Sequence, residues 1–447
     1  MTCTTRYVTA VRAGWGLWWV LLLMVLGGCG SAADAAPSWQ RPINLSAPLK
    51  LADAPVVAMN LAGDTVVVWV DGEADVHAAV RRAGRAFSAP MRVSRGAAGK
   101  TVDHPVVAID ESGNAIAVWQ LQEDAGPPNF VQAAVLRAGR FSRPRTLSAH
   151  AFGPAVAMNA AGDAIVTWAR ATKTGDVVQA ATRPRGGSFK RPITLSAAGQ
   201  DASFSDVAMN AAGEAIVVWE RGRGKTNIVQ ATLRPAGGSF SRPVNLSVAG
   251  RQAGGARVAI GRAGDAIVTW NLFNGTRFVV QAATRPARGA FSMPVDLSAP
   301  DRNGFRAQPA LDGSGQTIVV WLEEDLSRFF GVPSSAVVRM SMRSDGGTFS
   351  EPATLSRPGV QNPSVAMNPA GAVIAVWERA KDGLDSTGVQ AALRPPGGSF
   401  SSPANLSPAG QKLGYLGIAM DRAGNGIAVW YASHGRGRTV QAALLRG

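Results

Sequence analysis

The chain has 447 residues, of which 46% are hydrophobic and 17% are charged, and its formal net charge is +15. This apolar fraction is too high for an intrinsically disordered protein, and two cysteines are too few for a disulfide-dense secreted scaffold. The 51 glycines follow no Gly-X-Y triplet, which excludes a collagen. The length suits two or three ordinary domains, or one domain if the chain is built from repeats.

The first predicted element is an export signal over residues 1–36. Two arginines precede a short apolar stretch at residues 15–26, which is shorter than the roughly 20 residues that a membrane span needs. The sequence LGGC at residues 26–29 resembles the bacterial lipobox, in which the cysteine becomes the lipidated first residue of an anchored lipoprotein. We therefore expect Cys29 to carry a lipid at the cell surface. The alternatives are cleavage near residues 33–35, which would release a secreted protein, and an uncleaved anchor.

Both cysteines, Cys3 and Cys29, belong to this leader. The remainder of the chain therefore offers no disulfide, no thiol nucleophile and no cysteine ligand for zinc or iron–sulfur clusters. Because the chain is expected to be exported, we do not expect a nucleic-acid partner despite the positive charge.

Beyond residue 38 one unit recurs with a period close to 50 residues, and its clearest copy is VAMNAAGDAIVTW at residues 156–168. A glycine stands six residues before the tryptophan of every copy, and Asn or Asp stands nine before it in seven copies. This Asn-x-x-Gly block predicts a tight turn between two apolar strands. The tryptophans, which we expect to pack between neighbouring sheets, are Trp69, Trp119, Trp168, Trp219, Trp270, Trp321, Trp377 and Trp430.

Each unit contains two further predicted strands. The third reads Val-Gln-Ala-Ala in most copies, and we expect its glutamine to form hydrogen bonds from one sheet to the next. The fourth carries an aromatic residue, a proline three positions later and a serine seven positions later, as in residues 189–196. A recurrent proline favours an outer edge strand, because proline cannot donate a hydrogen bond to a neighbouring strand.

Four short strands repeated eight times resemble the blades of a β-propeller. The chain ends favour a closed ring over an open solenoid, which would show atypical capping repeats. Residues 39–46 form a lone fourth strand, and the last unit stops after its third strand at residues 440–445. The sequence thus predicts an all-β, eight-bladed propeller of four-stranded antiparallel blades over residues 37–447, closed by the N-terminal strand.

The loops separate into two sets. The turns between strands one and two and between strands three and four barely vary, whereas the other two loops vary and should lie together on one face, where binding is expected. Basic residues gather in these variable segments. A hypothesis is that they bind an anionic polymer, a glycan or a protein partner; the alternative is that they only solubilise the surface. The residues are Arg221, Arg223, Lys225, Arg251, Arg257, Arg277 and Arg306.

The turn block is also similar to the Asp box of sialidases, although its serine is missing. This resemblance implies an alternative function as a carbohydrate-active hydrolase or lyase. Sialidases use an arginine trio and a tyrosine nucleophile assisted by a carboxylate. The tyrosines beyond the leader are Tyr415 and Tyr431. Two carboxylates about 5–10 Å apart beside Tyr415, or an arginine trio, would favour an enzyme.

No residue is predicted to be catalytic. The four histidines show no metal-binding spacing, and neither a P-loop nor a Gly-x-Ser-x-Gly motif occurs. We therefore expect no cofactor and no metal. The favoured interpretation is a monomeric, non-enzymatic binding or scaffold module at the cell surface.

Overall fold

The computed structural model describes residues 37–47, 52–72, 75–96, 99–123, 126, 128–222, 226–324, 335–381, 385–435 and 437–446. The described residues all belong to one compact unit, Pro37–Gly447. The predicted export signal and Cys29 lie outside the described residues, as do Arg223 and Lys225 of the basic set. Within the described part of the chain, no helix has the length and apolarity that crossing a membrane requires.

The regular elements of this unit are β-strands arranged in antiparallel sheets, which confirms the predicted all-β class. Five sheets have four strands each. The first is β3 (Asp53–Met59), β4 (Thr65–Asp71), β5 (Asp75–Arg81) and β6 (Met91–Arg92). The second is β12 (Ala151–Met158), β13 (Ala164–Arg170), β14 (Val177–Arg183) and β15 (Ile193–Thr194). The third is β16 (Ala202–Met209), β17 (Ala215–Arg221), β18 (Ile228–Arg234) and β19 (Val244–Asn245).

Two further four-stranded sheets follow the same order. They are β20 (Ala253–Ile260), β21 (Ala266–Phe273), β22 (Phe278–Arg285) and β23 (Val295–Asp296), then β24 (Asn303–Leu311), β25 (Thr317–Glu324), β26 (Val337–Arg343) and β27 (Ala353–Thr354). A five-stranded sheet holds β7 (Lys100–Ile109), β8 (Ala115–Glu123), β9 (Phe130–Arg137), β10 (Arg140–Phe141) and β11 (Arg145–Ala149).

The remaining sheet has nine strands and contains both ends of the unit. Its strands are β28 (Val360–Met367), β29 (Val373–Lys381), β30 (Asp385–Arg394), β31 (Ala404–Asn405), β32 (Leu413–Met420), β33 (Gly426–His434), β34 (Gly437–Arg446), β1 (Ser38–Trp39) and β2 (Ile43–Asn44). The N-terminal β1 and β2 pair with the C-terminal β34, Ser38 opposite Arg446 and Ile43 opposite Ala442.

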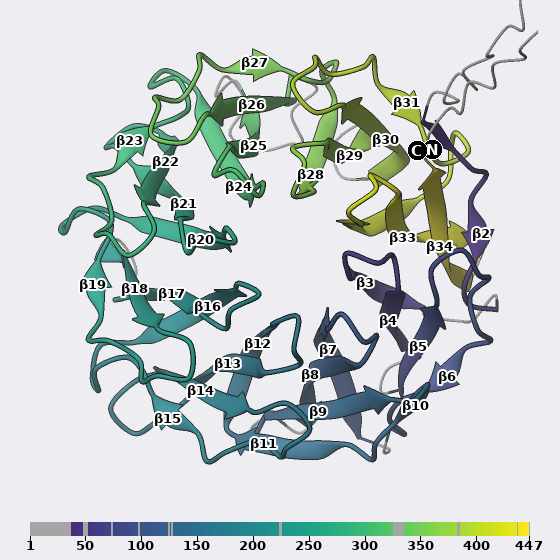
Figure 1. Cartoon of the computed structure of the whole chain (residues 1–447), viewed down its shortest axis with the longest axis horizontal. Helices are drawn as coiled ribbons and strands as arrows, with labels where there is room; N and C mark the ends of the chain where they lie inside the picture. The colour runs from purple at the N-terminus through teal and green to yellow at the C-terminus, as the bar shows by residue number, and fades with distance from the viewer. Residues whose placement is uncertain are drawn as a thin grey trace, which may run out of the picture. The chain divides into compact units, whose positions relative to one another are not determined.

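The first strand of each repeat lies nearest the centre of the array, and the short fourth strand lies at its outer edge (Figure 1). Contacts between first strands run in chain order from β3 through β7, β12, β16, β20, β24 and β28 to β32. The last of these, β32, in turn contacts β3. The outer position of the fourth strand confirms the interpretation of the recurrent proline.

The Asn-x-x-Gly block forms the predicted turn. In the first copy, the Asn60 side-chain oxygen accepts a hydrogen bond from the Asp64 backbone N–H at 2.8 Å, and the Gly63 N–H donates to the Asn60 carbonyl at 3.0 Å. Gly63 has φ of 92°, a conformation that favours glycine. One copy has Gly261 in place of the Asn, and there the Asp265 carboxylate oxygens lie 2.5 Å from where a Cβ would stand.

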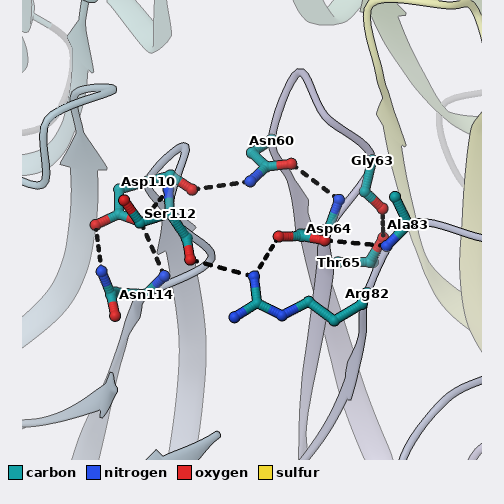
Figure 2. A network of polar contacts seen from close by, with 9 residues as sticks. All are labelled: Asn60, Gly63, Asp64, Thr65, Arg82, Ala83, Asp110, Ser112 and Asn114. Carbon is teal, nitrogen blue, oxygen red and sulfur yellow. Dashed lines mark hydrogen bonds and ion pairs between the residues drawn. The ribbon is translucent and has the colours of Figure 1, made fainter. Parts of the chain in front are cut away.

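These turns also connect neighbouring sheets (Figure 2). The Asn60 amide donates to the Asp110 carbonyl of the next turn at 3.0 Å. Arg82 pairs with Asp64 in its own sheet and donates to the Ser112 carbonyl of the next sheet at 3.1 Å. The uniform turns are therefore part of the architecture, as their lack of variation suggested.

The core lies between the sheets, and each repeated tryptophan is fully buried there. Trp219 packs with Ile165 and Val178 of the preceding sheet. Trp69, in the first complete sheet, packs in the same way with Ile427 and Val440 of β33 and β34. The prediction that the tryptophans pack between neighbouring sheets is confirmed.

The prediction that the repeated glutamines bond between sheets is wrong. The Gln230 side-chain oxygen accepts from the Trp219 indole N–H at 3.1 Å, and its amide donates to Asn245 at 2.8 Å. All three residues belong to one sheet, on β17, β18 and β19. The same bond from the indole N–H to the glutamine forms at Trp270, Trp377 and Trp430, whereas the indole N–H groups of Trp119 and Trp168 have no partner among the described residues.

The serine of the fourth segment has a structural role that its recurrence did not reveal. In seven of the eight repeats its hydroxyl oxygen accepts a hydrogen bond from a third-strand backbone N–H, as Ser247 does from Val229 at 2.9 Å. The outer strand is too short to supply a carbonyl for every N–H of the strand beside it. The serine supplies the missing acceptor.

Candidate ligand-binding site

A β-bulge interrupts the first strand of every repeat, close to the strand's beginning. At each bulge one residue has a positive φ between 47° and 69°. We call these eight residues the bulge ring: Ala54, His104, Gly153, Phe204, Gly255, Arg306, Asn362 and Tyr415. This conformation costs a residue other than glycine roughly 1–2 kcal/mol, yet only two of the eight are glycines.

The bulge ring lies on the variable-loop face, because each bulge follows the loop that enters its strand. Side chains of the preceding sheet support two of the bulges. The Gln120 side-chain oxygen accepts from the Gly153 N–H at 3.0 Å, and a Glu220 carboxylate oxygen accepts from the Gly255 N–H at 2.7 Å. Gln120 and Glu220 each directly follow a repeated tryptophan. The buried tryptophan therefore positions the following residue, whose side chain accepts the hydrogen bond from the bulge of the next sheet.

A cavity of about 1180 Å³ opens beside the bulges of β20, β24, β28 and β32. Four residues of the bulge ring line it: Gly255, Arg306, Asn362 and Tyr415. Arg257, Tyr431, Glu324 and Glu378 contribute charged and aromatic groups to the same wall. Large concave sites with a few convergent polar groups are where small ligands bind.

Two tyrosines form the aromatic part of this cavity. Tyr415 is 58% exposed, and its ring centroid lies 6.0 Å from that of Tyr431 at a tilt of 47°. The Arg438 guanidinium lies 4.7 Å from the Tyr431 ring centroid and also pairs with Asp53. Burial, and in smaller part Asp53, raises the pKa of both phenols. The tyrosines therefore stay neutral at pH 7 and serve as hydrogen-bond donors and ring surfaces.

The most buried acid in the cavity is Glu378, which is 1% exposed. Its carboxylate accepts hydrogen bonds from the Asn362 amide at 2.9 Å and from the Ser386 hydroxyl. Burial raises the pKa of Glu378 despite these bonds, and burial also raises the pKa of Glu324 and of Glu220. Glu378 thus positions the side chain of a bulge-ring residue.

Replacing Glu378 with glutamine is expected to flatten the dependence of stability on pH. Because burial raises its pKa above the usual 4.5, the folded chain binds more protons than the unfolded chain above that pH. The free energy of unfolding of the wild type should therefore fall as the pH rises from about 4.5 through the raised pKa. Urea unfolding over this range should show a smaller fall for Glu378→Gln. The exposed control Glu351→Gln should retain the wild-type slope, and an unchanged slope in Glu378→Gln would contradict the assignment.

The structure separates the predicted basic residues. Arg257 and Arg306 line the cavity. Arg221 lies at a different recess, where it donates to the Gln200 side chain at 3.2 Å. Arg251 donates to the Asn274 carbonyl at 3.3 Å, and Arg277 precedes β22.

The cavity shares some features with the sialidase pattern and lacks others. Two tyrosines and two glutamates do line one cavity, but the raised pKa of each tyrosine disfavours a phenolate nucleophile. The described lining residues include two arginines, one fewer than a trio. Among the described residues, no group of three or more His, Cys, Asp or Glu side chains could hold a metal ion.

No protein-family model matches the chain, and no curated protein matches it in sequence. Solved structures do resemble it. The lectin BP39L from Burkholderia pseudomallei has a TM-score of 0.56 at 16% identity, covering 82% of this chain and 100% of that chain. The polysaccharide lyase Uly1 has a TM-score of 0.51 at 8% identity, covering 88% and 90%. These similarities show that the chain shares the β-propeller fold.

Proposed function

We propose that residues 37–447 form a closed eight-bladed propeller that binds an acidic saccharide in the cavity beside Tyr415. The cycle of first-strand contacts and the eight buried tryptophans support the ring. The nine-stranded sheet then corresponds to two blades, which are joined by the single pair Ser386–Leu413. In this interpretation β1 and β2 complete the eighth blade.

The observation that carries the ligand class is the combination of groups in one cavity. Arg257 and Arg306 can pair with a carboxylate, Tyr415 offers an exposed ring to a sugar face, and Asn362 and Gln361 can bond hydroxyl groups. A lectin and a polysaccharide lyase are among the structures with this fold, which agrees with a saccharide ligand. We favour binding over hydrolysis or elimination because the described lining holds two arginines and not the trio that a sialidase uses.

Calorimetric titration of the purified full chain with trigalacturonate tests this proposal, with the methyl-esterified trisaccharide as the neutral control. The free acid should bind and the ester should bind much more weakly. Arg257→Ala should weaken binding of the acid by about 10-fold or more, the effect of losing one charged hydrogen bond. Arg251→Ala is the matched control and should change little, because Arg251 lies outside the cavity lining.

Equal affinity for the acid and the ester, or equal effects of the two arginine variants, would contradict an acidic saccharide at this site. Cleavage of the trisaccharide during the titration, detected as new reducing ends or as an unsaturated product, would instead favour the hydrolase or lyase.

We also propose that the chain is exported and anchored by a lipid on Cys29. The short apolar stretch and the lipobox-like sequence at residues 26–29 support this proposal. Cells labelled with radioactive palmitate should incorporate label into the wild type and not into Cys29→Ala. Equal incorporation would rule out the anchor and leave secretion of a free protein.

A further inference from the structure

The residues of the bulge ring follow an order that repeats after four blades. Around the contact cycle, each half presents a small residue, a basic residue, a small or amide residue and an aromatic residue. The first half is Ala54, His104, Gly153 and Phe204, and the second is Gly255, Arg306, Asn362 and Tyr415.

In this order, residues of the same chemical type stand opposite each other across the centre of the ring. The strands β7 and β24, which carry His104 and Arg306, are four steps apart in the contact cycle in both directions and lie on opposite sides of the centre of the array (Figure 1). The strands β16 and β32, which carry Phe204 and Tyr415, are also four steps apart in both directions. Basic residues and aromatic residues therefore each occupy opposite positions.

All four of these side chains are open to solvent. Phe204 is 67% exposed, the His104 side chain is 61% exposed, and Arg306 and Tyr415 are also exposed. Packing therefore does not account for large side chains at positions where the backbone favours glycine. Gly153 and Gly255 occupy the same position in other blades, so glycine meets the structural need. Exposed residues other than glycine that keep a strained positive φ are typical of functional positions.

We propose that the bulge ring carries two half-sites for acidic saccharide, one made by Arg306 and Tyr415 and the other by His104 and Phe204. This proposal rests on the proposed function and extends it to the opposite side of the ring. In each half-site the basic residue holds the sugar carboxylate and the aromatic ring stacks on a sugar face. The cavity described above contains only the first half-site.

The two half-sites differ in strength. The His104 Nδ1 lies 3.0 Å from the Asp103 carboxylate, which competes with a bound carboxylate. Arg306 forms no ion pair among the described residues, and its half-site includes the cavity of about 1180 Å³. The half-site of Arg306 and Tyr415 is therefore the tighter one.

Calorimetric titration of the full chain with trigalacturonate should give two trisaccharides per chain, one bound at least 10-fold more tightly than the other. The double variant Arg306→Gly/Tyr415→Gly should lose the tight event and keep the weak one. His104→Gly/Phe204→Gly should keep the tight event and lose the weak one. Neither variant should have a lower melting temperature, because glycine suits the positive φ at all four positions.

Ala54→Gly is the matched control, since it makes the same backbone change and removes only a methyl group. It should leave both binding events unchanged. A single binding event that only Arg306→Gly/Tyr415→Gly removes would overturn the second half-site while the proposed function stands. Absence of any binding would overturn both. Binding that neither double variant changes would overturn the half-sites and place the saccharide away from the bulge ring.

Discussion

Replacing Trp69 with alanine is expected to lower the free energy of unfolding by about 3–5 kcal/mol, within about 1.5 kcal/mol of the same change at Trp219. The change at Trp219 also removes the hydrogen bond from its indole N–H to Gln230, whereas the Trp69 indole N–H has no partner among the described residues. Both side chains are fully buried and each packs against the second and third strands of the preceding sheet. For Trp219 that sheet precedes it in sequence. For Trp69 it is the sheet of β33 and β34, at the opposite end of the chain. Costs of this similar size are therefore expected only if the ring is closed.

Urea unfolding of the two variants, followed by circular dichroism, measures this comparison. Trp39→Phe is the control, because Trp39 stands where the other fourth segments carry phenylalanine and it is only partly buried. That change should cost less than about 1.5 kcal/mol. A cost at Trp69 far below the cost at Trp219 would mean that the first and last sheets form a weak or open contact.

The fold was largely predictable because the chain repeats its own pattern eight times. A turn glycine such as Gly63 and a tryptophan such as Trp219 occur at fixed positions in every copy, so their roles follow from spacing alone. The partner of Gln230 was not predictable in this way. Period and spacing assign a residue to a strand, but which neighbour its flexible amide reaches depends on the pairing of β17, β18 and β19.

The candidate site was less predictable, for a physical reason. Charge alone selected seven basic residues, of which Arg257 and Arg306 line the cavity. The bulge ring gave no signal at the 50-residue period because its residues differ from one repeat to the next. Phenylalanine and tyrosine also have no local preference for positive φ, so Phe204 and Tyr415 gave no sign of the bulge. The cavity forms where the first strands of four repeats meet, so the pattern of a single repeat cannot predict its lining.

Deleting residues 37–46 is expected to cost at least about 5 kcal/mol, a large fraction of the 5–15 kcal/mol that stabilises a typical domain. The deletion removes β1 and β2, so that β34 becomes an exposed edge. The Val440 N–H loses its acceptor on Ser46 at 3.0 Å, and its carbonyl loses the Leu45 N–H at 2.8 Å. Loss of the buried Leu45 also opens the core around Trp69. We expect a much lower melting temperature, measured by differential scanning calorimetry, and exposure of apolar surface to a hydrophobic dye.

A circular permutant separates loss of the strand from loss of its position in the chain. Because Ser38 pairs with Arg446, residues 37–47 can follow residue 446 through the Pro-x-Gly-Gly turn that other units use between their third and fourth strands. The new chain would begin at Ala52. Every blade is then contiguous in sequence, and the permutant should melt within a few degrees of the wild type, since the contacts are unchanged and only the chain connection moves. A deletion variant as stable as the intact chain would show that β1 and β2 do not stabilise the sheet of β32, β33 and β34. A permutant that fails to fold while the intact chain folds would show that the N-terminal strand must be supplied from the opposite end of the chain.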